Sequence, residues 1–183
     1  NQALAASGLE PEYLELELTE SVMLDNPDIA LSTIHELRTM GVQISIDDFG
    51  TGYSSLSYLK SIEANRIKID RSFITDIIIN PDDAVIVLSI IAMAHQMGRQ
   101  VIAEGVENEE QMYYLLHHNC DELQGYFFSR PVPANEVETL LTEERRLFIN
   151  NDMVRNKQNR IIVVENDDDV DKSLQIALKK YNY

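Results

Sequence analysis

Residues 42–55, VQISIDDFGTGYSS, decide the fold because they join a short hydrophobic strand to an acidic, glycine-containing loop. The β-branched run 42–46 is typical of a buried strand, and a helical pattern begins at Leu56. Asp47 and Asp48 therefore lie where a strand ends, which is the active edge of barrels and of doubly wound α/β sheets. Taken alone, the stretch fits equally well an Asp-rich turn in which glycines supply positive φ angles.

The composition narrows the classes of partner and compartment. The chain has 183 residues, 44% of them hydrophobic, and a formal net charge of −16, which argues against a nucleic-acid polymer or an anionic membrane as partner. Cys120 is the only cysteine, so the sequence offers no disulfide framework and no thiolate cluster for zinc. No run approaches the roughly 18 apolar residues of a transmembrane helix. We expect a cytoplasmic chain, although its parent protein could be attached to a membrane through other regions.

Strands and helices alternate along residues 1–149. Strands are predicted at 13–20, 42–48, 66–70, 100–106 and 123–128. Helices are predicted from Pro27 to Gly41, from 56 to about 62, and over 84–97, 109–117 and 133–148. Because each return to a parallel neighbour needs a crossover, this order indicates a parallel α/β sheet. A barrel is the first interpretation and a doubly wound sheet is the alternative.

Four charged residues favour the barrel. Glu17, Asp47, Lys68 and Glu104 fall near the ends of four successive strands, on the face opposite the bulky aliphatic residues. Such positions converge at a barrel mouth. A complete barrel of this type has eight strands and about 250 residues. We therefore predict an incomplete TIM-type barrel that contains about the last five strand–helix units, with the first three strands upstream of Asn1 and one edge unpaired.

The composition changes near residue 150. Residues 1–149 form the truncated barrel domain, and the polar segment 150–159 is predicted to be a linker. An apolar strand, an acidic loop and an amphipathic helix follow in residues 160–183. This last segment is predicted to be a single βα fragment of a further domain.

The acidic residues indicate a metal site. Glu17, Asp47, Asp48 and Glu104 in one mouth would repel one another unless cations compensated them. Oxygen ligands without clustered His or Cys favour Mg²⁺ or Mn²⁺ over zinc, and two such ions can hydrolyse a phosphodiester. Lys68 could then orient the attacking water or stabilise charge on the phosphate. The structural alternative is that Lys68 pairs with Asp70 on the same strand face.

Five motifs occur in an order that resembles the EAL-domain family of bacterial cyclic di-GMP phosphodiesterases. They are ELTE at 17–20, DDFGTGYSSL at 47–56, KID at 68–70, AEGVE at 103–107 and QGYFF at 124–128. The resemblance covers about residues 1–145. It implies a modified TIM barrel that cuts cyclic di-GMP to the linear dinucleotide pGpG with two Mg²⁺ or Mn²⁺ ions.

The same resemblance implies roles for individual residues. Glu17, Asp47, Asp48 and Glu104 would form the metal site, and Lys68 and Glu104 would be catalytic. Residues supporting the loop and the substrate would be Glu20, Gly50, Thr51, Gly52, Asp70, Glu107 and Gln124. The family also suggests a homodimer formed through the loop after Asp48. Residues 160–183 resemble the start of a response-regulator receiver domain, in which Asn166 replaces one residue of the usual acidic pair.

The resemblance also shows what is absent from the sequence. The family's Glu-Ala-Leu segment, an arginine that contacts the substrate and an asparagine that binds metal would precede Asn1. We therefore expect an active parent phosphodiesterase and an inactive isolated chain. One alternative is a catalytically degenerate barrel that binds cyclic di-GMP as a receptor. A further alternative is a metal enzyme of the enolase kind with Lys68 as base. This alternative offers no reason for the glycine loop.

Overall fold

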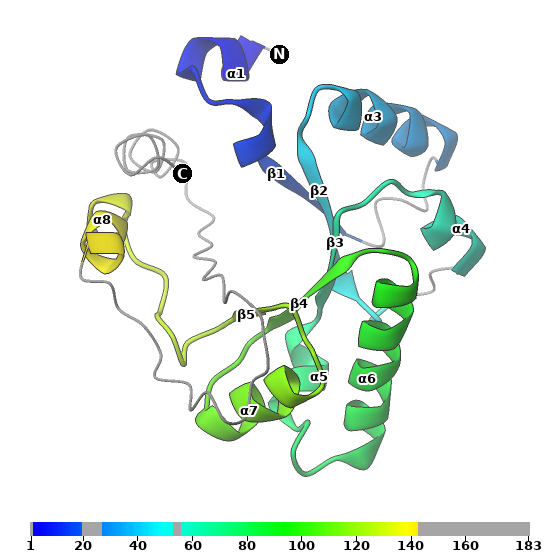
Figure 1. The fold of residues 1–183 in the computed structure, drawn as a ribbon, viewed down its shortest axis with the longest axis vertical. Coiled ribbons are helices and arrows are strands. Elements are labelled where there is room, and N and C mark those ends of the chain that lie inside the picture. The colour runs from blue at the N-terminus through cyan, green and yellow to red at the C-terminus, as the bar shows by residue number, and fades with distance from the viewer. Residues whose placement is uncertain (1, 20–26, 53–55, 143–183) are drawn as a thin grey trace.

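The computed structural model describes residues 2–19, 27–52 and 56–142, and its described strands form one parallel sheet (Figure 1). The strands are β1 (Glu15–Thr19), β2 (Gln43–Phe49), β3 (Arg66–Ile69), β4 (Gln100–Glu104) and β5 (Glu122–Gln124). The helical elements are α1 (Gln2–Ser7), η1 (Pro11–Tyr13), α3 (Pro27–Thr39), α4 (Leu56–Ser61), α5 (Arg71–Thr75), α6 (Pro81–Gln96), α7 (Glu109–His117) and α8 (Ala134–Thr142).

The strand order distinguishes between the two predicted architectures. Each strand pairs with the next one along the chain, in the order β1-β2-β3-β4-β5. A doubly wound sheet would reverse its order at a switch point, whereas a barrel adds strands consecutively. The prediction of an incomplete TIM-type barrel is therefore confirmed for the described residues, with β1 and β5 at the two edges of the sheet.

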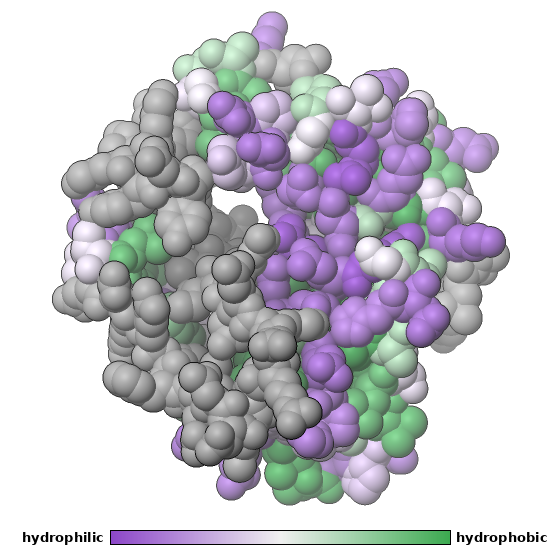
Figure 2. All heavy atoms as spheres, viewed as in Figure 1, coloured by the Kyte–Doolittle hydropathy of each residue, from purple (hydrophilic) through white to green (hydrophobic). Residues whose placement is uncertain are grey.

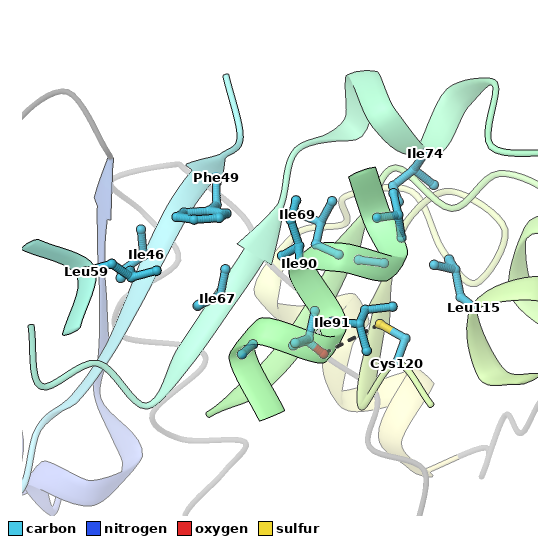
Figure 3. Close-up of a cluster of buried hydrophobic side chains, with 14 of the residues drawn as sticks. Ile46, Phe49, Leu59, Ile67, Ile69, Ile74, Ile90, Ile91, Leu115 and Cys120 are labelled. Atoms are coloured by element: carbon cyan, nitrogen blue, oxygen red, sulfur yellow. Dashed lines mark hydrogen bonds between the residues drawn. The ribbon is translucent and has the colours of Figure 1, made fainter. Parts of the chain in front are cut away.

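The sheet has one apolar face and one charged face. Alternate residues of the strands point to opposite sides, and the outward set packs against α3, α5 and α6. Figure 3 shows this core, in which Ile69 lies next to Ile90 of α6 and Ile46 lies next to Leu59 of α4. The opposite, inner face carries charged side chains on each of the five strands. The helices α3, α5 and α6 therefore pack on the apolar face, and the charged side chains gather on the opposite face of the sheet.

Local signals in the sequence explain where several helices begin and end. Asn80 accepts a hydrogen bond from the backbone nitrogen of Asp82, and Pro81 occupies the first turn of α6, as predicted. The buried Arg99 donates to the carbonyl oxygens of Leu59 and Ile62, at 2.7 and 2.6 Å, at the end of α4. Carbonyl groups in the last turn of a helix lack the full set of backbone partners, so the guanidinium supplies a donor to both, in addition to the backbone nitrogen of Ile62, which donates to Leu59 at 3.3 Å.

Several predicted boundaries differ from the structure, and for two of them the contacts show the reason. The strand predicted over 123–128 ends at Gln124 because the chain then turns against Val106. A Cβ on Gly125 would lie 2.1 Å from the oxygen of Val106, and Phe127 donates its backbone N–H to that same oxygen. The strand predicted over 66–70 stops at Ile69, because Asp70 caps the additional short helix α5.

Some predictions fall outside the described residues. The linker at 150–159, the βα fragment at 160–183 and the end of the helix predicted to reach 148 are among them. Within the described part of the chain, no helix is long and apolar enough to cross a membrane.

Candidate active site

Lys68 lies at the centre of the charged face and contacts acids from three other strands. Its Nζ atom is 2.7 Å from Oε1 of Glu17, 3.0 Å from Oδ1 of Asp47 and 2.7 Å from Oε1 of Glu104. Only 2% of Lys68 is exposed. The four residues predicted to converge at the barrel mouth therefore do so. Asp70, the alternative partner of Lys68, instead accepts a hydrogen bond from the backbone nitrogen of Ser72.

Burial and hydrogen bonds shift the pKa values of Lys68 and Glu104. Burial by itself would lower the pKa of Lys68, but hydrogen bonds to Glu104 and Glu17 outweigh that effect and raise it. Burial raises the pKa of Glu104, although Lys68 opposes the shift. Lys68 is therefore a permanent cation at neutral pH, and Glu104 takes up a proton more readily than an exposed carboxylate does.

Asp48 joins the acidic residues through a break in the strand. In a regular strand Asp47 and Asp48 would point to opposite faces. The pairing of β2 with β3 shifts register between Ile46 and Phe49, and Asp48 has a φ of 54°. Oxygen atoms of Asp47, Asp48 and Glu104 consequently lie within 4.8 Å of one another. The irregularity brings consecutive acids to one place, which simple alternation does not predict.

The irregular backbone at Asp48 has a detectable sequence signal. Aspartate is among the few residues other than glycine that tolerate a positive φ. Gly50 follows two positions later with a φ of 103°. Burial raises the pKa of Asp48, and the charges of Asp47 and Asp70 raise it further. The local fold thus holds this carboxylate near other negative charges at an energetic cost.

The acidic residues fit a divalent cation. Glu17, Asp47, Asp48 and Glu104 carry four negative charges when ionised, and Lys68 neutralises one, which leaves three uncompensated. The ligands offered are carboxylate oxygens, which Mg²⁺ and Mn²⁺ prefer. Asp47, Asp48 and Glu104 are already close enough to share an ion.

The loop after β2 is tied to the acids and to the helices. Thr51 donates from its hydroxyl to the carbonyl oxygen of Asp48 at 2.9 Å. A Cβ on Gly50 would lie 2.9 Å from the Phe73 ring, so a side chain there would require that ring to shift. Gly52 is exposed. Glu20, predicted to brace this loop, lies outside the described residues.

The remaining predicted residues lie around the acidic group. Gln124 pairs in register with Glu104, and its Oε1 atom is buried without a hydrogen-bond partner among the described residues. Glu107 accepts a hydrogen bond from Arg71 at 2.7 Å, and both side chains are largely exposed. Arg71 was not singled out from the sequence. Its side chain packs so closely on Gly105 that a Cβ there would lie 2.3 Å from Cγ of Arg71.

Comparison with known proteins identifies related sequences. The sequence profile of the EAL domain matches residues 1–131. The chain is 47% identical over 135 residues to the bifunctional diguanylate cyclase/cyclic di-GMP phosphodiesterase MucR of Pseudomonas aeruginosa, covering 74% of the chain and 20% of MucR. It is 46% identical over 143 residues to the cyclic di-GMP phosphodiesterase NbdA of the same organism, covering 78% of the chain and 18% of NbdA. The chain thus spans about a fifth of these relatives.

Solved structures show the same architecture. The MucR phosphodiesterase in complex with c-di-GMP superposes with a TM-score of 0.72 at 46% identity, covering 74% of this chain and 55% of that one. A manganese and cyclic di-GMP complex of BlrP1 from Klebsiella pneumoniae superposes with a TM-score of 0.65 at 36% identity, covering 69% of this chain and 32% of BlrP1.

Proposed function

We propose that this chain, which belongs to the EAL domain family, supplies part of a phosphodiesterase site that hydrolyses cyclic di-GMP to pGpG. The observation that carries the proposal is the arrangement of Lys68 among Glu17, Asp47 and Glu104, with Asp48 brought alongside. The relatives that act on or bind cyclic di-GMP, MucR and NbdA among them, support this choice of substrate.

The residues have distinct roles in the proposed reaction. Glu17, Asp47, Asp48 and Glu104 would hold two Mg²⁺ or Mn²⁺ ions, which when bound lower the pKa of water and polarise the phosphate. Lys68 presents a permanent ammonium group that orients the attacking water or stabilises negative charge on the phosphate. Glu104, whose pKa is raised by burial, is suited to accept the proton of that water.

Supporting residues shape the site around these groups. Thr51 and Gly50 hold the loop next to Asp48, with Gly52 beside them. Asp70 caps the helix that begins directly after β3. Gln124 lies beside Glu104 with a free carbonyl oxygen and would face the substrate at the mouth. Glu107 would support the mouth through Arg71. The role of Glu20 as a brace of the loop stays a prediction from the sequence.

The proposed activity requires a complete barrel. The described sheet has five strands, and a TIM barrel has eight. We propose that the other strands lie upstream in the complete protein and carry the family's remaining metal and substrate ligands. A protein restricted to residues 1–149 should then show no turnover. Cyclic di-GMP hydrolysis by that segment at the rate of the complete protein would contradict this part of the proposal.

The central experiment measures cyclic di-GMP turnover by the complete protein with Mg²⁺, Mn²⁺ or Ca²⁺, alongside calorimetric titration with the same nucleotide. Formation of pGpG with Mg²⁺ or Mn²⁺ is the expected result. Binding without turnover in either metal would instead favour a receptor, the alternative that the family resemblance leaves open. If the complete protein neither bound nor hydrolysed cyclic di-GMP, both the phosphodiesterase and the receptor assignment would be refuted.

We also propose a homodimer formed beside the loop after Asp48. This loop packs on α5 and α6, since Gly50 is close to both Phe73 and Ile90. Apolar residues on and next to α6 are exposed, namely Ile78, Ile79, Val85 and Ile86. Figure 2 shows apolar surface over α6, in contrast to the hydrophilic residues over the strands. A second copy of the chain would bury this surface.

The dimer is tested by substituting its most exposed apolar residue. Ile79→Asp should shift the complete protein from dimer to monomer in analytical ultracentrifugation, because a charge would be buried in the interface. Ile29→Asp is a matched control, since Ile29 is 68% exposed on α3 and Ile79 is 78% exposed. An unchanged dimer in both variants would exclude this surface as the interface. The receiver-like tail and the cytoplasmic location stay predictions from the sequence.

A further inference from the structure

A second ion cluster lies on the same face of the sheet as Lys68, at the opposite ends of the strands. Arg66 pairs through Nη1 with Oε2 of Glu15, and its Nε atom is 3.4 Å from Oε1 of Glu122. The side chain of Glu122 is 2% exposed and that of Arg66 is 13% exposed. These three residues, called the floor cluster below, belong to β1, β3 and β5.

Each residue of the floor cluster lies two positions before another inward residue of the same strand. Arg66 precedes Lys68 on β3, Glu15 precedes Glu17 on β1, and Glu122 precedes Gln124 on β5. Side chains two positions apart share a face, and alternate strands contribute to one layer of a barrel interior. The floor cluster is therefore the next layer from the odd-numbered strands beneath the one that holds Lys68 and Glu17.

The reach of Arg66 has a mechanical consequence. Neighbouring strands lie about 4.8 Å apart, so strands two apart are separated by roughly 9.5 Å on a flat sheet. Arg66 contacts an acid on the strand two places away on each side, and those strands are the edges β1 and β5. Two long side chains can bridge this distance, so the two ion pairs tie both edge strands to β3. Glu17 reaches Lys68 across the same number of strands, with 2.7 Å between Oε1 and Nζ, so the placing of the edge strands bears directly on that contact.

We propose that Arg66 is a positioning residue that sets the curvature of the sheet and thereby the spacing of the acids around Lys68. This inference rests on the proposed metal-dependent function, which it extends to a residue that touches neither metal nor substrate. Arg66 is suited to the task because its planar guanidinium presents donors in two directions, which a lysine ammonium on a flexible stem does not. The floor cluster is then a clamp, and its effect on the site is indirect.

The test compares Arg66→Met and Arg66→Lys with Arg38→Met in the complete protein. Arg38 is a matched control because its guanidinium likewise donates to a side chain far away in the sequence, Oδ1 of Asn65 at 2.8 Å, but Arg38 lies on α3 and not in the sheet. Hydrogen exchange of the β1 and β5 amides reports the clamp without any metal. Mn²⁺ titration reports its consequence, and the turnover number at saturating Mn²⁺ separates positioning from catalysis.

Arg66→Met should accelerate exchange in β1 and β5 and weaken Mn²⁺ binding about 10-fold, as substitutions behind metal ligands do. Turnover at saturating Mn²⁺ should stay within about 2-fold, and Arg66→Lys should restore the affinity only in part. Exchange and Mn²⁺ affinity that match those of Arg38→Met would overturn the inference. If the unsubstituted protein neither bound Mn²⁺ nor hydrolysed cyclic di-GMP, the proposed function would fail, and the exchange comparison would still decide whether Arg66 is a clamp.

Discussion

The two cations of β3, Lys68 and Arg66, lie in environments that differ in charge balance. Lys68 contacts three acids, and Asp48 adds a fourth, so one cation faces four carboxylates. Arg66 faces two carboxylates, Glu15 and Glu122. Buried ion pairs are common structural devices and by themselves do not mark a site. The surplus of acids around Lys68 is what creates a place for additional cations.

Loss of Lys68 is expected to have the largest effect. Lys68→Ala should lower cyclic di-GMP turnover by about 10²–10³-fold at saturating Mn²⁺, as loss of one charge-stabilising donor does in other enzymes. It should also reduce the free energy of unfolding of the metal-free protein by about 3–5 kcal/mol, because buried carboxylates lose their counter-ion. Steady-state kinetics and denaturant unfolding measure the two quantities.

The comparison with Arg66 makes this prediction specific. Lys60→Ala is the control, because Lys60 is an exposed lysine on α4. If Lys68→Ala and Arg66→Met lost stability alike and kept the same turnover at saturating Mn²⁺, the two clusters would be equivalent structural clamps. The distinction drawn from charge balance would then be wrong.

Asp48 provides the next test, because it supplies surplus charge without pairing strands. Asp48→Asn removes the charge and retains a residue that accepts the φ of 54°. Mn²⁺ affinity of the complete protein, measured by calorimetry, should fall about 10–100-fold. The metal-free protein should be no less stable, since Asp48 lies close to other negative charges. A lower melting temperature with unchanged Mn²⁺ affinity would assign Asp48 a structural role instead.

Much of this arrangement could be predicted from residue alternation. Apolar and polar residues alternate in residues 13–20, 42–47 and 66–70, so the inward positions of Glu17, Asp47 and Lys68 followed from a period of two. The sequential strand order followed from the helices between the strands. These features depend on local pattern, which a single sequence displays directly.

Other features depend on contacts between distant segments. Sequence reasoning did not find the floor cluster, although Glu15, Arg66 and Glu122 occupy inward positions by the same alternation. Their pairing spans 51 residues between Glu15 and Arg66 and depends on how far the sheet curves. β5 ends early because Gly125 lies close to the backbone of Val106. The pattern of hydrophobic residues in the sequence does not predict such a contact.

The acids around Lys68 should also make stability depend on pH. The pKa values of Glu104 and Asp48 are raised in the folded protein, chiefly by burial. A group whose folded pKa is raised binds a proton more tightly in the folded state, so its stabilising contribution is present at low pH and is lost as pH rises through that pKa. The metal-free protein should therefore become more stable as pH falls from neutrality toward the range in which these carboxyl groups protonate.

The raised pKa of Lys68 does not alter this trend. Its contribution is fully present below the ordinary lysine pKa and is lost only at more alkaline pH. Thermal unfolding at a series of pH values from neutrality downward, with and without Mn²⁺, measures the effect. Asp48→Asn should flatten the metal-free profile, whereas Asp82→Asn, on α6, should not. If the stability of both variants depended on pH in the same way, the pH dependence would arise from groups other than Asp48.

The smallest effect is expected at the exposed pair of Arg71 and Glu107, which lies in neither ion cluster. The two side chains are 58% and 45% exposed, and Nη2 of Arg71 is 2.7 Å from Oε1 of Glu107. Water screens such a pair, so Glu107→Gln should change the free energy of unfolding by no more than about 1 kcal/mol. Arg71→Ala should cost somewhat more, because the stem of Arg71 also packs on Gly105. Arg71→Met, which keeps most of that packing, should behave like Glu107→Gln in denaturant unfolding. Equal destabilisation by Arg71→Met and Arg66→Met would contradict this reasoning. The stability contributed by an ion pair would then not depend on its burial.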